Sequence, residues 1–252
     1  MAEASLTGKR ALRAVFFDVD DTLYSTTEFA RKARANAVRA MLAAGLRAPF
    51  ELVLAELEEV TREFPSNHDR HFDNLLLRLP AAACGPVNPA VIVAAGVVGY
   101  HETKRLELAP YPDVPETLRR LAARRGLVLG VITAGLAVKQ AEKLLRLGIL
   151  DCLDPRAVFI TDQLGYDKTN PKLYTLACAA LRLAPAECLF VGDHPVRDAD
   201  SARSAGLVTV LVRRGGKYGA VAGRQPPDYA IGGLAELVAI IDRDFQVPDF
   251  RG

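Results

Sequence analysis

Residues 14–22 read Ala14-Val15-Phe16-Phe17-Asp18-Val19-Asp20-Asp21-Thr22, a short apolar run that leads directly into closely spaced carboxylates. Consecutive apolar residues of this kind predict a strand that is buried on both faces of a parallel sheet. Asp18 and Asp20 would then lie at the carboxyl end of the strand, the edge where open α/β sheets bind their ligands. Because carboxylates this close repel each other, the pair implies a bound cation or a shared proton. Aspartate is also common in ordinary turns, so the meaning of the pair depends on the rest of the chain.

Strand-like and helix-like segments alternate along most of the remaining chain. Further apolar runs predict strands at residues 127–133, 157–160, 189–192, 208–212 and 229–231. Helical periodicity is found at residues 112–125, 136–147, 171–181, 196–205 and 234–243. This alternation predicts right-handed βαβ units and therefore an α/β fold, a doubly wound parallel sheet with a Rossmann-like core.

The segment between the first two strands breaks this alternation, because it contains only helical patterns. These patterns cover residues 28–44, 51–64, 72–79 and 89–105. A run of this length is too long for a single crossover, so it predicts an inserted domain. We expect an α/β catalytic core made of residues 1–24 and 109–252, and an all-helical cap domain over residues 25–108 that covers the acidic loop.

The composition is ordinary for a soluble globular protein. The chain has 252 residues, of which 50% are hydrophobic and 25% are charged, with a formal net charge of +2. No long basic run is present, which argues against nucleic acid or a membrane surface as a partner. The four cysteines form no CxxC pair, and the first residues contain no apolar stretch typical of a secretory signal. We therefore expect a cytoplasmic protein. Its oligomeric state is left open between a monomer and a homodimer.

Polar residues follow the other predicted strands as well. Thr133 ends the second strand, Lys168 precedes a predicted helix, and Asp193 and Asp198 follow the strand at residues 189–192. Each of them alone has an ordinary explanation, as a helix cap or an exposed charge. Together they would supply a hydroxyl, an ammonium and further carboxylates at one edge of the sheet, which points to a catalytic site.

Four motifs resemble those of the haloacid dehalogenase superfamily, in the phosphatase branch whose helical cap follows the first strand (subfamily I). They are FFDVDDTLY at residues 16–24, VITAG at 131–135, KTNPKLY at 168–174 and VGDHPVRD at 191–198. Their order and spacing extend over nearly the whole chain. The resemblance implies that Asp18 is a nucleophile that forms an aspartyl-phosphate. It also implies that Asp20 is the general acid and base.

The resemblance further implies a Mg²⁺ site. Its ligands would be the carboxylates of Asp18 and Asp193 and the backbone carbonyl of Asp20, with Asp198 beside them or directly on the metal. These are the oxygen ligands that Mg²⁺ prefers.

Phosphate binding is assigned by the same resemblance to Thr133, Ala134 and Lys168. Ala134 stands where the family commonly has Asn or Asp, so only its backbone N–H is expected to contribute. We prefer Lys168 to Lys172 for the cationic role, because Lys168 keeps the family distance to the helix-starting Pro171.

The expected function is therefore a Mg²⁺-dependent phosphomonoester hydrolase that acts on a small phosphorylated metabolite. Asp20 argues against a dehalogenase, because halide leaves carbon without needing a proton. The alternatives are a phosphomutase or phosphotransferase of the same superfamily and a non-catalytic phospho-receiver module, which would be about half as long and need no cap. His68 and Arg70, in the helical segment, are candidate substrate-binding residues; the alternative is a solvated loop between two helices.

Overall fold

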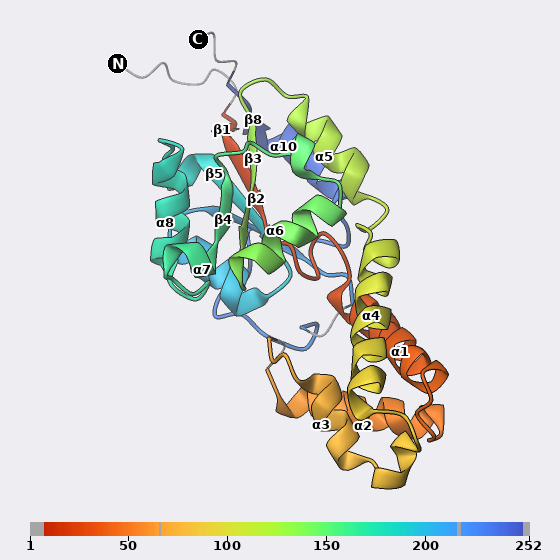
Figure 1. The fold of residues 1–252 in the computed structure, drawn as a ribbon. Helices are drawn as coiled ribbons and strands as arrows, with labels where there is room; N and C mark the ends of the chain where they lie inside the picture. Colours follow the sequence, from red (N-terminus) through yellow and green to blue (C-terminus); the bar gives the residue numbers. More distant parts are fainter. Residues whose placement is uncertain (1–7, 66, 216–217, 249–252) are drawn as a thin grey trace. The chain divides into compact units, whose positions relative to one another are not determined.

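The computed structural model describes residues 8–65, 67–215 and 218–248 (Figure 1). The chain divides into two compact units. The first runs to Ser25 and resumes at Ala109, and the second is Thr26–Leu108.

The first unit is built on a parallel sheet with the strand order β4-β3-β2-β5-β6-β7. The strands are β2 (Ala14–Phe17), β3 (Val128–Thr133), β4 (Val158–Ile160), β5 (Cys188–Gly192), β6 (Val208–Val212) and β7 (Tyr229–Ile231). From β2 in the interior, the chain builds outward through β3 and β4, and then in the other direction through β5, β6 and β7. The predicted doubly wound sheet is confirmed, and its switch point lies between β2 and β5.

Helices cover both faces of this sheet (Figure 1). They are α5 (Val114–Ala122), α6 (Ala137–Arg146), α7 (Thr161–Leu164), α8 (Pro171–Ala180), α9 (Ser201–Ser204) and α10 (Ala235–Asp244), with 3₁₀ turns η2 (Leu150–Cys152) and η3 (Pro185–Glu187). Helix α8 packs with α9, and α5 packs with α10. Aromatic side chains fill the interior on the α8 side, where the rings of Tyr174 and Phe190 meet edge to face with centroids 5.0 Å apart.

The second unit contains helices and no strand among its described residues. The helices are α1 (Thr26–Ala43), α2 (Phe50–Glu63), α3 (His71–Arg78), the 3₁₀ turn η1 (Ala81–Cys84) and α4 (Pro89–Glu107). Helices α1 and α4 pack along their length, and Gly99 permits the close approach because a Cβ there would lie 2.8 Å from the Cβ of Ala40. Among the residues described, no helix of the protein is both long and apolar enough to cross a membrane.

Two local features differ from the sequence-based expectations. The prediction of a single α-helix over residues 196–205 is wrong at its start. Residues Pro195–Asp200 form a π-helix (η4), and within the predicted range only Ser201–Ser204 is α-helical. The wider turn is marked by the backbone N–H of Ala199, which donates to the carbonyl of His194 five residues earlier at 3.4 Å. The short parallel pair β1 (Arg10–Ala11) and β8 (Phe245–Gln246) was not predicted, because two residues are too few for a hydrophobic pattern.

Candidate active site

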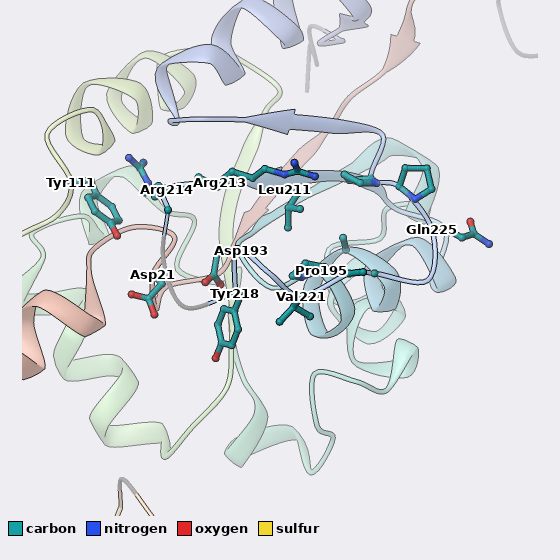
Figure 2. A pocket seen from close by; sticks show the side chains of 18 residues that line it. Asp21, Tyr111, Asp193, Pro195, Leu211, Arg213, Arg214, Tyr218, Val221 and Gln225 are labelled. Carbon is teal, nitrogen blue, oxygen red and sulfur yellow. The ribbon is translucent and has the colours of Figure 1, made fainter. Parts of the chain in front are cut away.

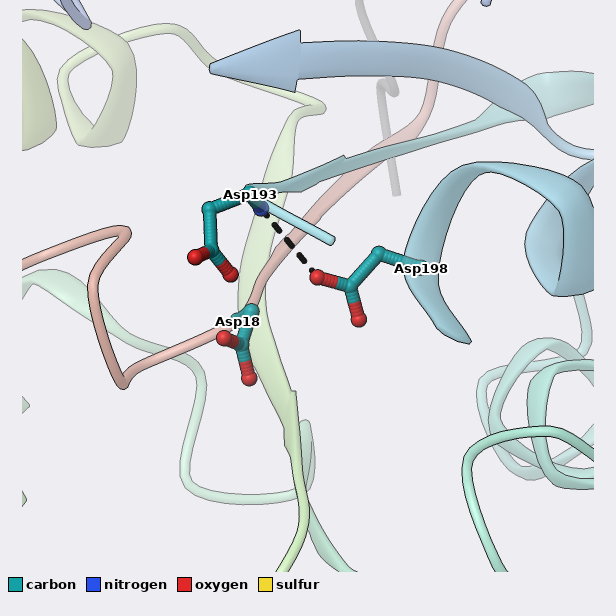
Figure 3. A group of neighbouring side chains, drawn as sticks. All are labelled: Asp18, Asp193 and Asp198. Atoms are coloured by element: carbon teal, nitrogen blue, oxygen red, sulfur yellow. Dashed lines mark hydrogen bonds between the residues drawn. The ribbon is translucent and has the colours of Figure 1, made fainter. Parts of the chain in front are cut away.

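Three carboxylates meet at the switch point of the sheet (Figure 3). Asp18 directly follows β2 and Asp193 directly follows β5, and these strands are neighbours. The Asp18 N–H donates to the carbonyl of Val191 at 2.8 Å, so the hydrogen bonds between β2 and β5 continue as far as the site. Asp198 joins from η4, and carboxylate oxygens of the three residues lie within 4.8 Å of one another. The sheet therefore brings together side chains that are up to 180 positions apart in the chain.

Backbone contacts fix the position of Asp198. Its Oδ2 accepts hydrogen bonds from the backbone N–H groups of Asp193 at 3.1 Å and His194 at 3.0 Å. A Cβ on Gly192 would collide with the same carboxylate. Glycine at the end of β5 is thus what allows the carboxylate to approach the strand.

Lys168 supplies a positive charge to this cluster. Its ammonium lies 2.6 Å from Asp18 Oδ1 and 2.5 Å from Asp198 Oδ1, and the side chain is buried. Burial alone would lower the pKa of Lys168, but the two carboxylates outweigh it and hold the pKa above its usual value. Lys172, in contrast, is exposed in the first turn of α8.

Three carboxylates surround one ammonium in this cluster, and the pKa values of two of them are raised. Burial, with the neighbouring carboxylates, raises the pKa of Asp18 to about 7. The same causes raise the pKa of Asp193 to about 8. Carboxylate oxygens that lie within 4.8 Å of one another, with one lysine among them, form the donor set of a hard divalent cation.

Asp20 lies outside this cluster, in a network of its own. Its Oδ1 accepts a hydrogen bond from the Tyr24 hydroxyl at 2.6 Å, and its Oδ2 accepts one from Gln140 Nε2 at 3.2 Å. The Lys143 ammonium lies 2.6 and 2.8 Å from the two oxygens. Burial alone would raise the pKa of Asp20, but these three donors lower it below its usual value. The next residue, Asp21, has a φ of 58°, which turns the chain sharply after Asp20.

Gln140 links Asp20 to the end of β3. The Thr133 hydroxyl donates to Gln140 Oε1 at 3.3 Å, and Gln140 Nε2 donates to the Ala134 carbonyl at 2.7 Å. Sequence reasoning did not single out Tyr24, Gln140 or Lys143. A signal was present for Gln140, because it is a polar residue at a buried position of an amphipathic helix.

The two candidate substrate residues, His68 and Arg70, belong to the helical unit and have local contacts there. The His68 ring stacks on Phe64, with centroids 4.7 Å apart, and contacts Asn74 through Nε2 at 3.1 Å. Arg70 has a side chain that is 66% exposed and forms an ion pair with Asp73 at 3.6 Å. Their role therefore stays a prediction.

A cavity of about 470 Å³ opens beside Asp193 in the α/β unit (Figure 2). Asp21 and Tyr111 line it from the segments that flank the helical insertion, and Arg214 lines it from the loop after β6. Arg214 is held there by Asp113, whose two oxygens both lie 3.0 Å from its Nη2, and by the ring of Tyr111. Arg214 and Tyr111 thus form one wall of the cavity, and Asp193 of the acidic cluster lies at its edge.

Comparisons with known proteins agree with this geometry. Residues 12–206 match the haloacid dehalogenase-like hydrolase family. The chain is 45% identical to the glyceraldehyde 3-phosphate phosphatase of Methanopyrus kandleri, over 91% of this chain and 97% of that protein. It is 37% identical to the glyceraldehyde 3-phosphate phosphatase of Methanocaldococcus jannaschii, with the same coverage. A crystal structure of a HAD phosphatase from Thermococcus onnurineus superposes with a TM-score of 0.60 at 24% identity, over 91% of this chain and 98% of that one, which shows a shared fold.

The chain belongs to the haloacid dehalogenase-like hydrolases, as its four motifs predicted. Within that family it is a phosphoric monoester hydrolase, because its full-length relatives at this level of identity are phosphatases. The prediction that this protein is an enzyme is therefore confirmed, and the alternative of a non-catalytic receiver module is not supported.

Proposed function

We propose that this phosphatase hydrolyses glyceraldehyde 3-phosphate, through an aspartyl-phosphate on Asp18 and with Mg²⁺ as its cofactor. The observation that carries the mechanism is the contact of Asp18 with Lys168 beside two further carboxylates at the switch point. The substrate is suggested by the names of the two relatives described above. The cavity beside Asp193 is of the size usual for small-molecule sites.

In the first step, a carboxylate oxygen of Asp18 attacks phosphorus, and the bond between phosphorus and the ester oxygen breaks. Asp20 gives its proton to the departing oxygen, so that an alcohol leaves rather than an alkoxide. The negative charge of the arriving phosphoryl group would raise the pKa of Asp20 and favour its protonated form.

In the second step, water attacks the phosphorus of the aspartyl-phosphate. Asp20, now a carboxylate, takes a proton from that water, and inorganic phosphate leaves while Asp18 is regenerated. Lys168 neutralises Asp18 and the phosphoryl oxygens where charge develops. The Thr133 hydroxyl would turn from Gln140 Oε1 to donate to a phosphoryl oxygen, and the backbone N–H of Ala134 would donate a second hydrogen bond to the phosphoryl group.

The metal would be held by the carboxylates of Asp18 and Asp193 and the carbonyl of Asp20, with Asp198 adjacent. When bound there, the cation would offset the negative charge of the phosphoryl group. The fit rests on the three neighbouring carboxylates, which share the single ammonium of Lys168.

Mg²⁺ is expected to stabilise the protein more at pH 8 than at pH 5.5. In the metal-free fold, Asp18 and Asp193 keep protons up to about pH 7 and 8, whereas the usual pKa is 3.8. The stability of the metal-free protein therefore falls as the pH rises between these values, and Mg²⁺ must displace fewer protons at pH 8. At a concentration of 100 times Kd the ion adds about 2.7 kcal/mol, which is roughly 5–10 °C in Tm.

Differential scanning calorimetry with and without Mg²⁺ at both pH values measures this effect. Asp193→Asn is the matched variant and is expected to lose most of the Mg²⁺-induced shift. A larger shift at pH 5.5 than at pH 8 would contradict the proposed ligands.

We propose that residues 25–108 act as a cap domain over the site, with His68 and Arg70 contacting the organic part of the substrate. The support for this proposal is a separate helical unit inserted between β2 and β3. The four cysteines are free thiols, which supports a reducing compartment such as the cytoplasm.

Phosphate release from a panel of small phosphomonoesters, with Mg²⁺ and with a chelator, tests the function. The panel contains glyceraldehyde 3-phosphate, its isomer dihydroxyacetone phosphate, phosphoserine and 4-nitrophenyl phosphate. Glyceraldehyde 3-phosphate is expected to have the highest kcat/KM, and the chelator is expected to abolish turnover. Return of the phosphoryl group to a sugar without free phosphate would favour the mutase alternative.

A further inference from the structure

We propose that helix α6 positions Asp20 through Lys143, and that both proton transfers assigned to Asp20 depend on this contact. The inference rests on the proposed function, because it takes Asp20 as the acid and base. Lys143 would be a positioning residue, since it contacts Asp20 and none of the reacting atoms.

The Lys143 ammonium is placed across the Asp20 carboxylate. Its nitrogen lies 2.6 Å from Oδ1 and 2.8 Å from Oδ2. The ammonium also lies 5.8 Å from the centroid of the Tyr24 ring, so an aromatic face covers part of it. The Lys143 side chain is 20% exposed and that of Asp20 is 31% exposed, so both groups are partly shielded from water.

Each oxygen of Asp20 has a second donor from a different element. Tyr24, on the loop after β2, donates to Oδ1, and Gln140, one turn before Lys143 on α6, donates to Oδ2. With donors to both oxygens, the carboxylate is held in one rotamer and one plane. Such positioning has a large effect on rate, because a misplacement of about 1 Å can cost a factor of about 10².

Lys143 is not needed to attach α6 to the core. Leu144 of the same helix is 1% exposed, and Gln140 is bound to the end of β3 through the Ala134 carbonyl. Within the described part of the chain, the polar contacts recorded for the Lys143 ammonium go to Asp20. Loss of the ammonium should therefore alter Asp20 and leave the helix in place.

The choice of ester separates the two roles of Asp20. Nitrophenolate leaves without a proton, so formation of the aspartyl-phosphate from 4-nitrophenyl phosphate does not need the acid. Hydrolysis of the aspartyl-phosphate still needs the base. In Lys143→Met with Mg²⁺ present, rapid mixing should show a burst of about one nitrophenolate per active site, followed by turnover about 10²-fold slower than in the wild-type protein.

With glyceraldehyde 3-phosphate, the same variant should lose about 10²-fold in kcat with KM changed by less than about twofold, because substrate binding does not use Asp20. Lys143→Arg keeps a cation at this position and should recover kcat to within about tenfold. Lys139→Met is the matched control, an exposed lysine of the same helix, and should behave as the wild type.

Three results are decisive. The proposal is overturned if Lys143→Met keeps the wild-type kcat for both esters. It is overturned as well if the burst and the later turnover of Lys143→Met fall by the same factor, because an equal loss indicates a general structural defect. It is also overturned if Lys143→Arg is as slow as Lys143→Met while its Tm matches that of the wild type. A wild-type protein that turns over neither ester would instead reject the proposed function itself.

Discussion

Asp18→Asn is expected to lower phosphate release by about 10⁴-fold or more while the protein stays folded. The amide cannot form the aspartyl-phosphate, and no neighbouring carboxylate occupies the same position at the end of β2. The substitution should not lower the Tm of the metal-free protein, because burial and neighbouring carboxylates already raise the pKa of Asp18 to about 7 and so favour a neutral group. Phosphate release and calorimetry, both at pH 8, measure the two effects.

Asp151→Asn is the control, since Asp151 is an exposed aspartate of the same unit and should change neither quantity. Retention of more than a tenth of the activity by Asp18→Asn would reject Asp18 as the nucleophile. A Tm several degrees below that of the wild type would show that the charged form of Asp18 stabilises the fold, contrary to the direction of its pKa.

Lys168→Met is expected to damage both stability and activity. It leaves Asp18 and Asp198 buried without the cation that lies 2.6 and 2.5 Å from them. Breaking a buried pair in this way costs about 3–5 kcal/mol, or roughly 6–20 °C in Tm. Since carboxylates without a cation become protonated more readily, the loss should be smaller at pH 5.5 than at pH 8. Loss of a charge that stabilises the transition state should lower kcat by a further 10²–10³-fold, approximately.

Lys172→Met provides a matched comparison four residues away. Because Lys172 is exposed, its replacement should change the stability by less than about 0.5 kcal/mol and should leave kcat unchanged. If Lys172→Met lost activity and Lys168→Met did not, the cationic role would belong to Lys172. Calorimetry and steady-state kinetics on both variants distinguish these cases.

The sheet could be predicted from the sequence because its strands are short, apolar and separated by clear helical patterns. The strands Ala14–Phe17 and Val208–Val212 have the predicted bounds. The meeting of Asp18 and Asp193 could also be expected, since parallel strands end at one edge of a sheet. Asp198 and Lys168 could be singled out as polar residues near the predicted strand ends, and the family motifs gave them roles. Their positions depend on the paths of loops.

The environment of Asp20 could not be predicted in the same way. Its contacts with Gln140 and Lys143 depend on the rotation of α6 about its axis, and hydrophobic periodicity defines that rotation only approximately. The π-helix at residues 195–200 was missed for a related reason, because its contacts reach residues far along the chain. The Tyr174 hydroxyl donates to the Arg197 carbonyl, and the Lys168 ammonium lies 2.5 Å from Asp198. Both features follow from tertiary contacts that a local pattern does not contain.

The small ladder β1–β8 has a practical consequence for handling the protein. Arg10 is in register with Phe245, and β1 leads directly into the amino end of β2. Both ends of the described chain are thus fastened together at the edge of the sheet opposite to Asp18 and Asp193. A chemical label placed on Arg10 or Gln246, which are both exposed, would therefore lie at the end of the sheet away from the proposed catalytic residues.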